Sequence, residues 1–153
     1  MNCFVPAENS LGETRTALTP LSAASLVKLG LTLNVEAGLG RLSNYPDAAY
    51  AEAGATLVTD PVAALAAADL VMRVRKPSPE NIAGMKHGAW HLSFLDPFNE
   101  TELIGAFASA GVNAVSLEMI PRTTLAQKMD ALSSQASLAG YAAVIEAAQR
   151  LQM

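Results

Sequence analysis

The richest concentration of polar side chains lies between Pro121 and Gln135. Within this stretch, Arg122, Gln127, Asp130 and Ser133 supply a guanidinium, an amide, a carboxylate and a hydroxyl group. Such a mixture of hydrogen-bond donors and acceptors is what a ribose or a carboxamide requires for recognition. Helix capping and ordinary surface polarity explain such a cluster equally well, so the residue types alone leave both interpretations open.

The spacing of three of these residues predicts that they share one side of a helix, with Arg122 just before it at a loop-to-helix junction. We expect a long, Ala-rich helix from roughly Thr124 to Leu151. Gln127, Asp130 and Ser133 or Ser134 are three or four residues apart, which places them on the same side of such a helix. An apolar stripe is expected on the other side, formed by Leu125, Met129, Leu132 and Ala136. The pattern therefore predicts a polar patch backed by a packed face.

Arginines close two of the expected strands. Arg15 follows the first strand, two residues after Glu13, and Arg73 and Arg75 end the fourth. Alternation along a strand predicts that Arg73 and Arg75 point to one face. Because a planar guanidinium can bind a carboxylate or a phosphate through two donors, Arg15 and Arg75 are candidates for anion binding. Loop salt bridges and solvated charges are the competing explanations.

A short glycine-rich segment is the only fragment that resembles a dinucleotide fingerprint. Gly38-Leu39-Gly40 follows the second strand, not the first, and Ser43 stands where the third glycine would be. We interpret the segment as a glycine-rich turn. The sequence therefore predicts no pyrophosphate cradle, which needs bare backbone amides at a helix start.

The residues that most often bind metals or act as nucleophiles are scarce. Cys3 is the single cysteine and lies in an apolar run, which predicts a small buried side chain. His87 and His91 have no acidic neighbour in the sequence, so we expect structural or surface roles for them. No metal site is expected. Asp96 is expected to cap the turn that follows the fifth strand.

Short apolar runs alternate with amphipathic segments along the chain. The expected strands are Cys3–Pro6, Thr32–Glu36, Thr56–Val58, Leu70–Val74, Ala89–Phe94 and Val112–Ser116. Helices are expected to begin near Thr19-Pro20, Tyr45-Pro46, Asp60-Pro61 and Asn99-Glu100. The alternation predicts an α/β fold: an open, mostly parallel, Rossmann-like sheet with helices on both faces, ending in a long helix. No internal domain boundary is expected.

The composition of the chain argues against several classes of function. The 153 residues are 51% hydrophobic and 16% charged, which suits a packed globule. The formal net charge is -4 and no Lys/Arg run is present, so a nucleic-acid partner is not expected. Asp69, Glu118 and Glu146 interrupt the longest apolar stretches before they reach the roughly 18 residues of a membrane span. Without a secretory signal at the start, the expected location is the cytoplasm.

A specific family resemblance emerges from the polar stretch and its surroundings. The segment from Glu118 to Tyr141 is similar to the alpha subunit of proton-translocating NAD(P) transhydrogenases. The opening of the chain resembles the start of the wider alanine dehydrogenase and transhydrogenase superfamily, in the segments Val5–Glu8, Gly12–Pro20, Leu29–Gly30 and Val35–Gly40. The resemblance covers essentially the whole chain.

The resemblance implies a role for the chain in a larger protein. The family's NAD(H) domain has two lobes with the cofactor between them, and residues 1–153 resemble the first lobe, without the nucleotide-binding lobe. Arg122, Gln127, Asp130 and Ser133 then match cofactor-binding positions near the nicotinamide, and Gln127 and Asp130 are the candidate catalytic residues. The implied partners are a second lobe that holds NAD, a domain that carries NADP, and a membrane-embedded subunit. A homodimer that is cytoplasmic and peripheral to the inner membrane through its partners is expected.

The chain differs from members of these families at three positions, and two other functions remain open. Alanine dehydrogenases carry a lysine where this chain has Arg75 and a histidine where it has Asp96, which argues against amino-acid chemistry. Many relatives have a basic residue at the position of Leu125. One alternative is an alanine-dehydrogenase-like oxidoreductase lobe that binds a 2-oxo acid through Arg15 and Arg75. The other is a non-catalytic assembly module whose Ala-rich helix favours dimers.

Overall fold

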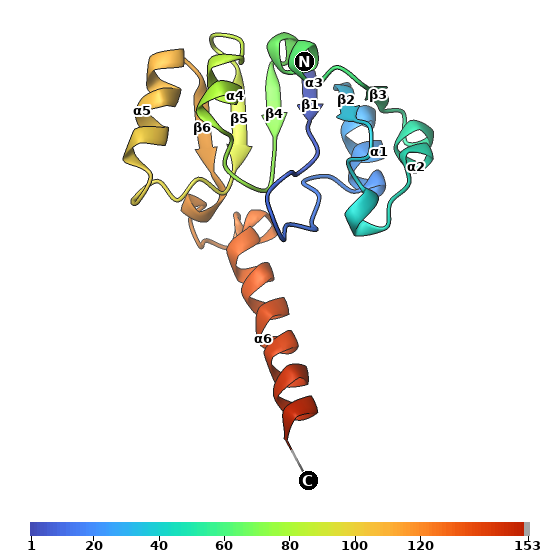
Figure 1. Cartoon of the computed structure of the whole chain (residues 1–153), viewed down its shortest axis with the longest axis vertical. Helices are drawn as coiled ribbons and strands as arrows, with labels where there is room; N and C mark the ends of the chain where they lie inside the picture. Colours follow the sequence, from blue (N-terminus) through green and yellow to red (C-terminus); the bar gives the residue numbers. More distant parts are fainter. Residues whose placement is uncertain (152–153) are drawn as a thin grey trace. The chain divides into compact units, whose positions relative to one another are not determined.

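The computed structural model describes residues 1–151, and its first part contains a six-stranded sheet. The strands are β1 (Asn2–Val5), β2 (Thr32–Glu36), β3 (Thr56–Val58), β4 (Leu70–Met72), β5 (Trp90–Ser93) and β6 (Asn113–Ser116). Their order in the sheet is β3-β2-β1-β4-β5-β6, and every neighbouring pair is parallel (Figure 1). The predicted parallel α/β fold is confirmed, and the strands match the predicted ranges to within two residues.

Five helices connect the strands of this sheet. They are α1 (Pro20–Lys28), α2 (Asp47–Glu52), α3 (Pro61–Ala67), α4 (Pro79–Ala83) and α5 (Thr101–Ala110), with a short 3-10 turn at Arg41–Ser43. Helix α4 was not among the helices expected from the sequence. Ser78 caps it by accepting a hydrogen bond from the Asn81 N–H, as Thr19 and Asp60 cap α1 and α3. Five residues are too few to show an apolar period, so the Ser-Pro start was the only sequence feature that marked this helix.

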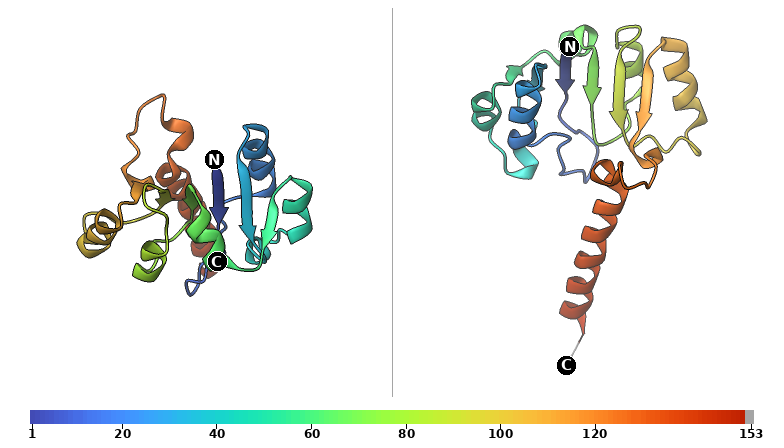
Figure 2. Two further views of the ribbon diagram at one scale, coloured as in Figure 1. Left: turned by 90° about the horizontal axis from the view of Figure 1, so that it is seen from above. Right: turned by 180° about the vertical axis from the view of Figure 1, so that it is seen from behind.

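The sheet separates two apolar clusters. On β1, Cys3 and Val5 face one side and Phe4 faces the other, as alternation along a strand requires. The first side packs on α1 and α2, and the second on α3, α4 and α5 (Figure 2). Tyr50 of α2 is fully buried, and its hydroxyl donates to the Leu18 carbonyl at 2.7 Å. Helices on both faces are therefore confirmed.

The turn after β2 depends on a glycine for steric reasons. A Cβ atom at Gly40 would lie 2.6 Å from both the Cβ atom and the carbonyl oxygen of Tyr45, and 2.8 Å from Cε2 of Tyr50. The backbone of Tyr45 and the buried ring of Tyr50 cannot shift to relieve such contacts without a loss of stability. The glycine spacing that resembles a nucleotide fingerprint therefore reflects close packing at this position.

Gly40→Ala is expected to lower the free energy of unfolding by about 1 to 2 kcal/mol. Chemical denaturation followed by the fluorescence of Trp90, the only tryptophan in the chain, measures this change. Gly105→Ala is the matched control, because a Cβ atom at that position of α5 meets nothing within 4 Å and alanine favours the helix. Equal stability of the two variants would contradict the steric explanation.

By their internal contacts, the residues of the chain divide into two compact units, Met1–Ser116 and the part that begins at Leu117. The expectation of a single domain without an internal boundary stays a prediction. The second unit contains 3-10 turns at Leu117–Met119 (η2) and Gln127–Met129 (η3), followed by α6 (Ala131–Arg150). No residue of α6 is buried. Among residues 1–151, no helix combines the length and the apolar character needed to cross a membrane.

The long helix begins seven residues later than predicted, at Ala131 instead of Thr124. Asp130 has φ -75° and ψ 84°, outside the helical region, and its side chain caps the helix. Leu125 and Met129 precede the helix and are 93% and 60% exposed. The prediction of one continuous helix with a packed apolar stripe from Leu125 onward is therefore wrong.

Candidate functional site

The second unit carries a polar hollow of about 450 Å³ immediately before and within the first turn of α6. We call it the polar junction, and its lining residues are Arg122, Thr123, Thr124, Gln127, Asp130, Ser133 and Ser134. All of the cofactor-binding positions implied by the family resemblance are among them. The seven residues include no histidine, cysteine or lysine.

Local hydrogen bonds fix the backbone of the polar junction. The Ala126 N–H donates to the carbonyl oxygen of Thr123 at 3.1 Å and to its hydroxyl at 3.3 Å. The Met129 N–H then donates to the Ala126 carbonyl at 2.8 Å, which closes η3. These tight turns place the amide of Gln127 one turn ahead of Asp130. The four residues thus meet at a loop-to-helix junction, as predicted. Gln127 lies in η3 and not on one helix face with Asp130 and Ser133, so that part of the prediction is wrong.

Asp130 is held both in position and in its charged state. Its Oδ1 accepts from the Ser133 N–H at 2.9 Å, and its Oδ2 accepts from the Ser133 hydroxyl at 2.5 Å. These hydrogen bonds, the hydroxyl first, together with the charge of Arg122, lower the pKa of Asp130 from its ordinary value. The polar junction therefore presents an ionised, oriented carboxylate at neutral pH.

The groups of the polar junction suit binding and orientation. Arg122 offers only donors, Asp130 only acceptors, and Gln127 both. The junction contains neither a group that titrates near neutral pH nor an activated nucleophile. Its chemistry is the positioning of a polar ligand.

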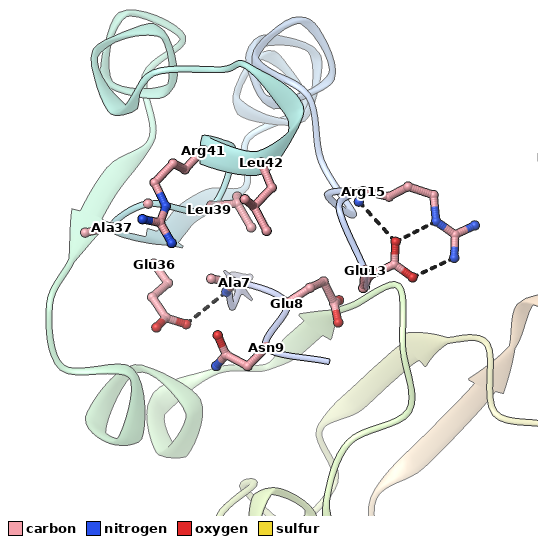
Figure 3. A pocket seen from close by; sticks show the side chains of 11 residues that line it. Ala7, Glu8, Asn9, Glu13, Arg15, Glu36, Ala37, Leu39, Arg41 and Leu42 are labelled. Atoms are coloured by element: carbon pink, nitrogen blue, oxygen red, sulfur yellow. Dashed lines mark hydrogen bonds and ion pairs between the residues drawn. The ribbon is translucent and has the colours of Figure 1, made fainter. Parts of the chain in front are cut away.

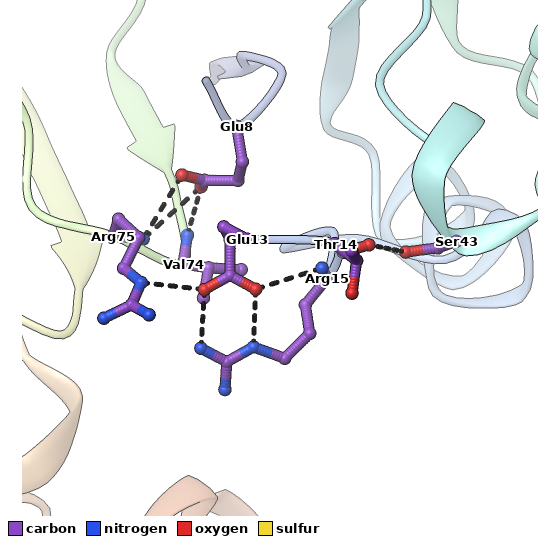
Figure 4. A network of polar contacts seen from close by, with 7 residues as sticks. All are labelled: Glu8, Glu13, Thr14, Arg15, Ser43, Val74 and Arg75. Atoms are coloured by element: carbon purple, nitrogen blue, oxygen red, sulfur yellow. Dashed lines mark hydrogen bonds and ion pairs between the residues drawn. The ribbon is translucent and has the colours of Figure 1, made fainter. Parts of the chain in front are cut away.

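A second cluster, which we call the Glu13 cluster, lies at the carboxyl ends of β1 and β4 in the first unit (Figure 4). Glu13 is 4% exposed. Its Oε1 accepts from Nε of Arg15 at 2.8 Å, and its Oε2 accepts from Nη2 of Arg15 at 2.7 Å and from Nε of Arg75 at 2.8 Å. Glu8 accepts from the Val74 N–H at 2.6 Å. The cluster thus ties the loop after β1 to the end of β4.

The electrostatics of the Glu13 cluster follow from these contacts. The hydrogen bonds from Arg15, joined by that from Arg75, lower the pKa of Glu13 to about 2 against the opposing effect of burial. The pKa of Arg15 is raised in turn, chiefly by its hydrogen bonds to Glu13. Arg15 and Arg75 are therefore brought together, but both guanidinium groups bind the carboxylate of Glu13. Anion binding by this pair stays a prediction.

Arg73 and Arg75 do not share a face. The predicted strand Leu70–Val74 ends at Met72, so the alternation of side chains does not extend to these arginines. Nη1 of Arg73 donates to Oδ1 of Asn81 on α4 at 2.9 Å, whereas Arg75 binds Glu13. The prediction of two cationic heads on one side of the strand is wrong.

The glycine turn borders a hollow of about 270 Å³ that faces the loop after β1 (Figure 3). Glu8, Glu13 and Glu36 line it, against Arg15 and Arg41, so acidic side chains outnumber basic ones. This balance disfavours a pyrophosphate.

The backbone of this turn is also already engaged. The Gly38 N–H donates to the two carboxylate oxygens of Asp47 at 2.8 and 3.1 Å. An amide that binds a carboxylate is not a bare donor for a phosphate. The interpretation of Gly38-Leu39-Gly40 as a structural turn is supported.

The histidine and cysteine predictions are confirmed for the two residues inside the sheet. His91 is fully buried, with Nε2 2.9 Å from Oγ of Ser93 and its ring centroid 5.2 Å from that of Phe107. Burial, together with the charge of Arg73, lowers the pKa of His91 to about 3. Burial raises the pKa of Cys3 to about 12. Both are core residues and neither is poised for acid-base or nucleophilic chemistry.

Asp96 lies in the loop between β5 and α5. It has φ 53°, in the left-handed region, and its carboxylate accepts from the side-chain amide of Asn99 at 2.9 and 3.1 Å. Its carbonyl accepts from the Asn99 and Glu100 N–H groups. Asp96 therefore stabilises the turn before α5, as predicted. Among residues 1–151, no three His, Cys, Asp or Glu side chains are grouped as metal ligands.

The loop salt bridge that the sequence left open for Arg15 forms with Glu13, whereas the contact of Glu13 with Arg75 was not expected. The acid stands two residues before Arg15, and Gly12 between the strand and the acid adopts φ 79°. A glycine at positive φ beside an acid-x-arginine triplet indicates a tight turn that folds the carboxylate back on the arginine. The contact with Arg75, 62 residues away, has no local sequence indication.

Comparisons with known proteins agree with the fold. The NAD(P) transhydrogenase subunit alpha of Cereibacter sphaeroides is 42% identical over 147 residues, 96% of this chain and 28% of that protein. The alanine dehydrogenase of Bacillus subtilis is 32% identical over 148 residues, 97% of this chain and 38% of that protein. A crystal structure of transhydrogenase from Sinorhizobium meliloti is similar with a TM-score of 0.94 and 41% identity, covering 100% of this chain and 46% of that one.

The chain therefore spans less than half the length of these relatives. A family model described as "Alanine dehydrogenase/PNT, N-terminal domain" matches residues 4–139, well over half of the chain. Together with the parallel sheet, this match assigns the fold and the ancestry of the molecule. The chain belongs to the alanine dehydrogenase/PNT N-terminal domain family.

Proposed function

We propose that this chain is the first lobe of an NAD(P) transhydrogenase alpha subunit, and that its polar junction positions NAD(H) for hydride transfer to NADP(H) on a partner domain. The observation that supports this most is the convergence of Arg122, Gln127, Asp130 and Ser133 on one exposed hollow. The family membership and the 42% identity to a transhydrogenase alpha subunit point in the same direction.

The donor and acceptor set of the polar junction fits the nicotinamide end of a dinucleotide. Arg122 donates to carbonyl or ribose oxygens, and Asp130 accepts from a hydroxyl or an amide N–H. The Ser133 hydroxyl gives its one proton to Asp130, so it orients that carboxylate and offers the cofactor an acceptor oxygen. Gln127 can both donate and accept, which suits a residue that bridges toward the second nicotinamide. The bound cofactors supply the hydride chemistry, and the residues of this chain supply orientation and electrostatics.

The adenosine and pyrophosphate parts require a second lobe under this proposal. The Gly38 N–H is occupied by Asp47, and the hollow beside it carries more acidic than basic side chains. A separate nucleotide-binding lobe would hold NAD, and a membrane-embedded subunit would couple the transfer to proton movement. We place the assembly at the cytoplasmic side of the inner membrane. The exposed apolar side chains of α6, such as Leu138 and Tyr141, favour a homodimer.

The test is an activity measurement on a complete two-lobe subunit that contains this chain, paired with an NADP-binding domain. The expected result is hydride transfer from NADH to an NADP analogue in single turnover. Failure of this transfer when the subunit binds NADH and the partner domain binds the NADP analogue would overturn the proposal.

An alanine-dehydrogenase-like lobe is the second candidate. The meeting of Arg15 and Arg75 at one strand-end edge favours it, as does the similarity to alanine dehydrogenase from Bacillus subtilis. It predicts NADH oxidation by the same two-lobe subunit with pyruvate and ammonium, without the NADP-binding domain. The departure at Asp96, where such enzymes carry a histidine, weighs against it.

A further inference from the structure

The four hydroxyl groups that line the polar junction differ in what their protons do. The Ser133 hydroxyl donates to Oδ2 of Asp130 at 2.5 Å, and the Ser134 hydroxyl donates to a backbone carbonyl at 3.0 Å. Because a hydroxyl group has a single proton, both serines have already used theirs. The other two hydroxyls, those of Thr123 and Thr124, donate to no group in the part of the chain that the structure describes.

Of these two threonines, Thr123 is the one that the fold holds in place. Its Oγ1 accepts from the Ala126 N–H at 3.3 Å, and its carbonyl oxygen accepts from the same N–H at 3.1 Å. Ala126 itself is buried, with 5% exposure. Because this N–H occupies one side of Oγ1, the hydroxyl proton of Thr123 points away from Ala126. Thr123 therefore brings an anchored hydroxyl with an available proton to the polar junction.

A neutral donor of this kind suits the carboxamide of a nicotinamide. A carboxamide carries a carbonyl oxygen and an NH2 group on one carbon, so it needs a donor and an acceptor side by side. Asp130 is the acceptor, since its carboxylate is ionised. Arg122 is a donor as well, but a guanidinium on the carboxamide would oppose the positive charge of the oxidised ring. The hydroxyl of Thr123 carries no charge, which leaves Arg122 for the ribose oxygens.

We propose that the hydroxyl of Thr123 donates a hydrogen bond to the carboxamide oxygen of the nicotinamide and so helps to set the orientation of the ring. This inference rests on the proposed function of the polar junction. It adds a cofactor-binding residue to those that the family resemblance implies. Because the Thr123 hydroxyl is already oriented by the Ala126 N–H, little freedom is lost when the cofactor binds.

Thr123→Val removes the donor and leaves the turn intact, because the Ala126 N–H keeps the carbonyl of residue 123 as its acceptor. In the complete two-lobe subunit, this variant is expected to bind NADH about 3- to 10-fold more weakly by calorimetry, which is the loss of one neutral hydrogen bond. Thr123→Ser restores the hydroxyl and is expected to bind NADH as the wild type does. Thr19→Val is the matched control and retains the affinity, because Thr19 accepts from the Ser22 N–H at the same 3.3 Å but caps α1 in the first unit.

The thionicotinamide analogue of NADH tests which atom accepts the hydrogen bond. Sulfur is a weaker acceptor than oxygen, so the wild-type subunit is expected to bind NADH more tightly than the analogue. In Thr123→Val the ratio of the two dissociation constants is expected to fall toward one, whereas a disturbed fold would weaken both nucleotides alike and keep the ratio. Unchanged NADH affinity or an unchanged ratio in Thr123→Val would overturn this inference alone, provided that the wild-type subunit transfers hydride. A wild-type subunit that fails to transfer hydride would refute the proposed function and this inference with it.

Discussion

In a complete alpha subunit that contains this chain, Asp130→Ser is expected to lower the single-turnover rate of hydride transfer by about 10- to 100-fold. The carboxylate of Asp130 is ionised and fixed by two hydrogen bonds from Ser133. Removing such a preorganised acceptor costs about 1.4 to 2.7 kcal/mol of the barrier, because the nicotinamide is then held less well in the reactive geometry.

Serine is chosen because it separates the two roles of Asp130, the N-cap of α6 and the charged acceptor for the cofactor. A serine at the N-cap still accepts from the Ser133 N–H, so α6 keeps its first turn. Circular dichroism is therefore expected to show unchanged helix content. Asp60→Ser is the matched control, since Asp60 caps α3 by the same contact, to the Ala63 N–H at 3.1 Å. If both serine variants transfer hydride at the unchanged rate, Asp130 only caps α6 and has no role in orienting the nicotinamide.

Glu13→Gln is expected to lower the free energy of unfolding of the first unit by about 2 to 3 kcal/mol at pH 7. The amide cannot neutralise Arg15 and Arg75, and it accepts through one oxygen instead of two. The full depression of the pKa of Glu13 would correspond to a little more than 3 kcal/mol, and the half-exposed arginines reduce this through solvent screening. Denaturation followed by Trp90 fluorescence measures the loss, and the exposed Glu52→Gln on α2 is the control.

The same substitution removes a defined pH dependence. The pKa of Glu13 falls from 4.5 in the unfolded chain to about 2 in the folded chain. The stability that this carboxylate contributes is therefore complete above about pH 4.5 and is lost progressively as the pH falls toward 2. The difference between the wild-type chain and Glu13→Gln is expected to shrink over that range. A difference that stays constant from pH 7 to pH 2.5 would contradict the role of the Glu13 cluster.

The architecture of the sheet was predictable because its causes are local. Apolar runs of three to six residues and Thr-Pro or Asp-Pro helix starts depend on neighbours in the chain, so the order of elements followed from the sequence. The division into two compact units at Ser116 had no such indication, because no linker composition marks it. The five residues of α4 were too few to display a period.

The composition of the polar junction was predictable, but its geometry was not. The residue propensities favour a helix from Thr124 to Leu151. The side chain of Asp130, however, accepts a hydrogen bond from the backbone of the next turn and acts as an N-cap, so the helix begins at Ala131. The four residues still meet, because a 3-10 turn followed by a cap places them around one hollow. The partner of Arg75 was not predictable, since Glu13 is separated from it by 62 residues.

The proposed function requires a division between two lobes, in which this chain orients the nicotinamide end of a dinucleotide and another lobe retains the rest. Titration of NADH into the purified 153-residue chain, followed by calorimetry, tests that division most directly. We expect no saturation below about 1 mM, because the only glycine turn with a fingerprint-like spacing is occupied by Asp47. Tight one-to-one binding of NADH by this chain alone would contradict the account.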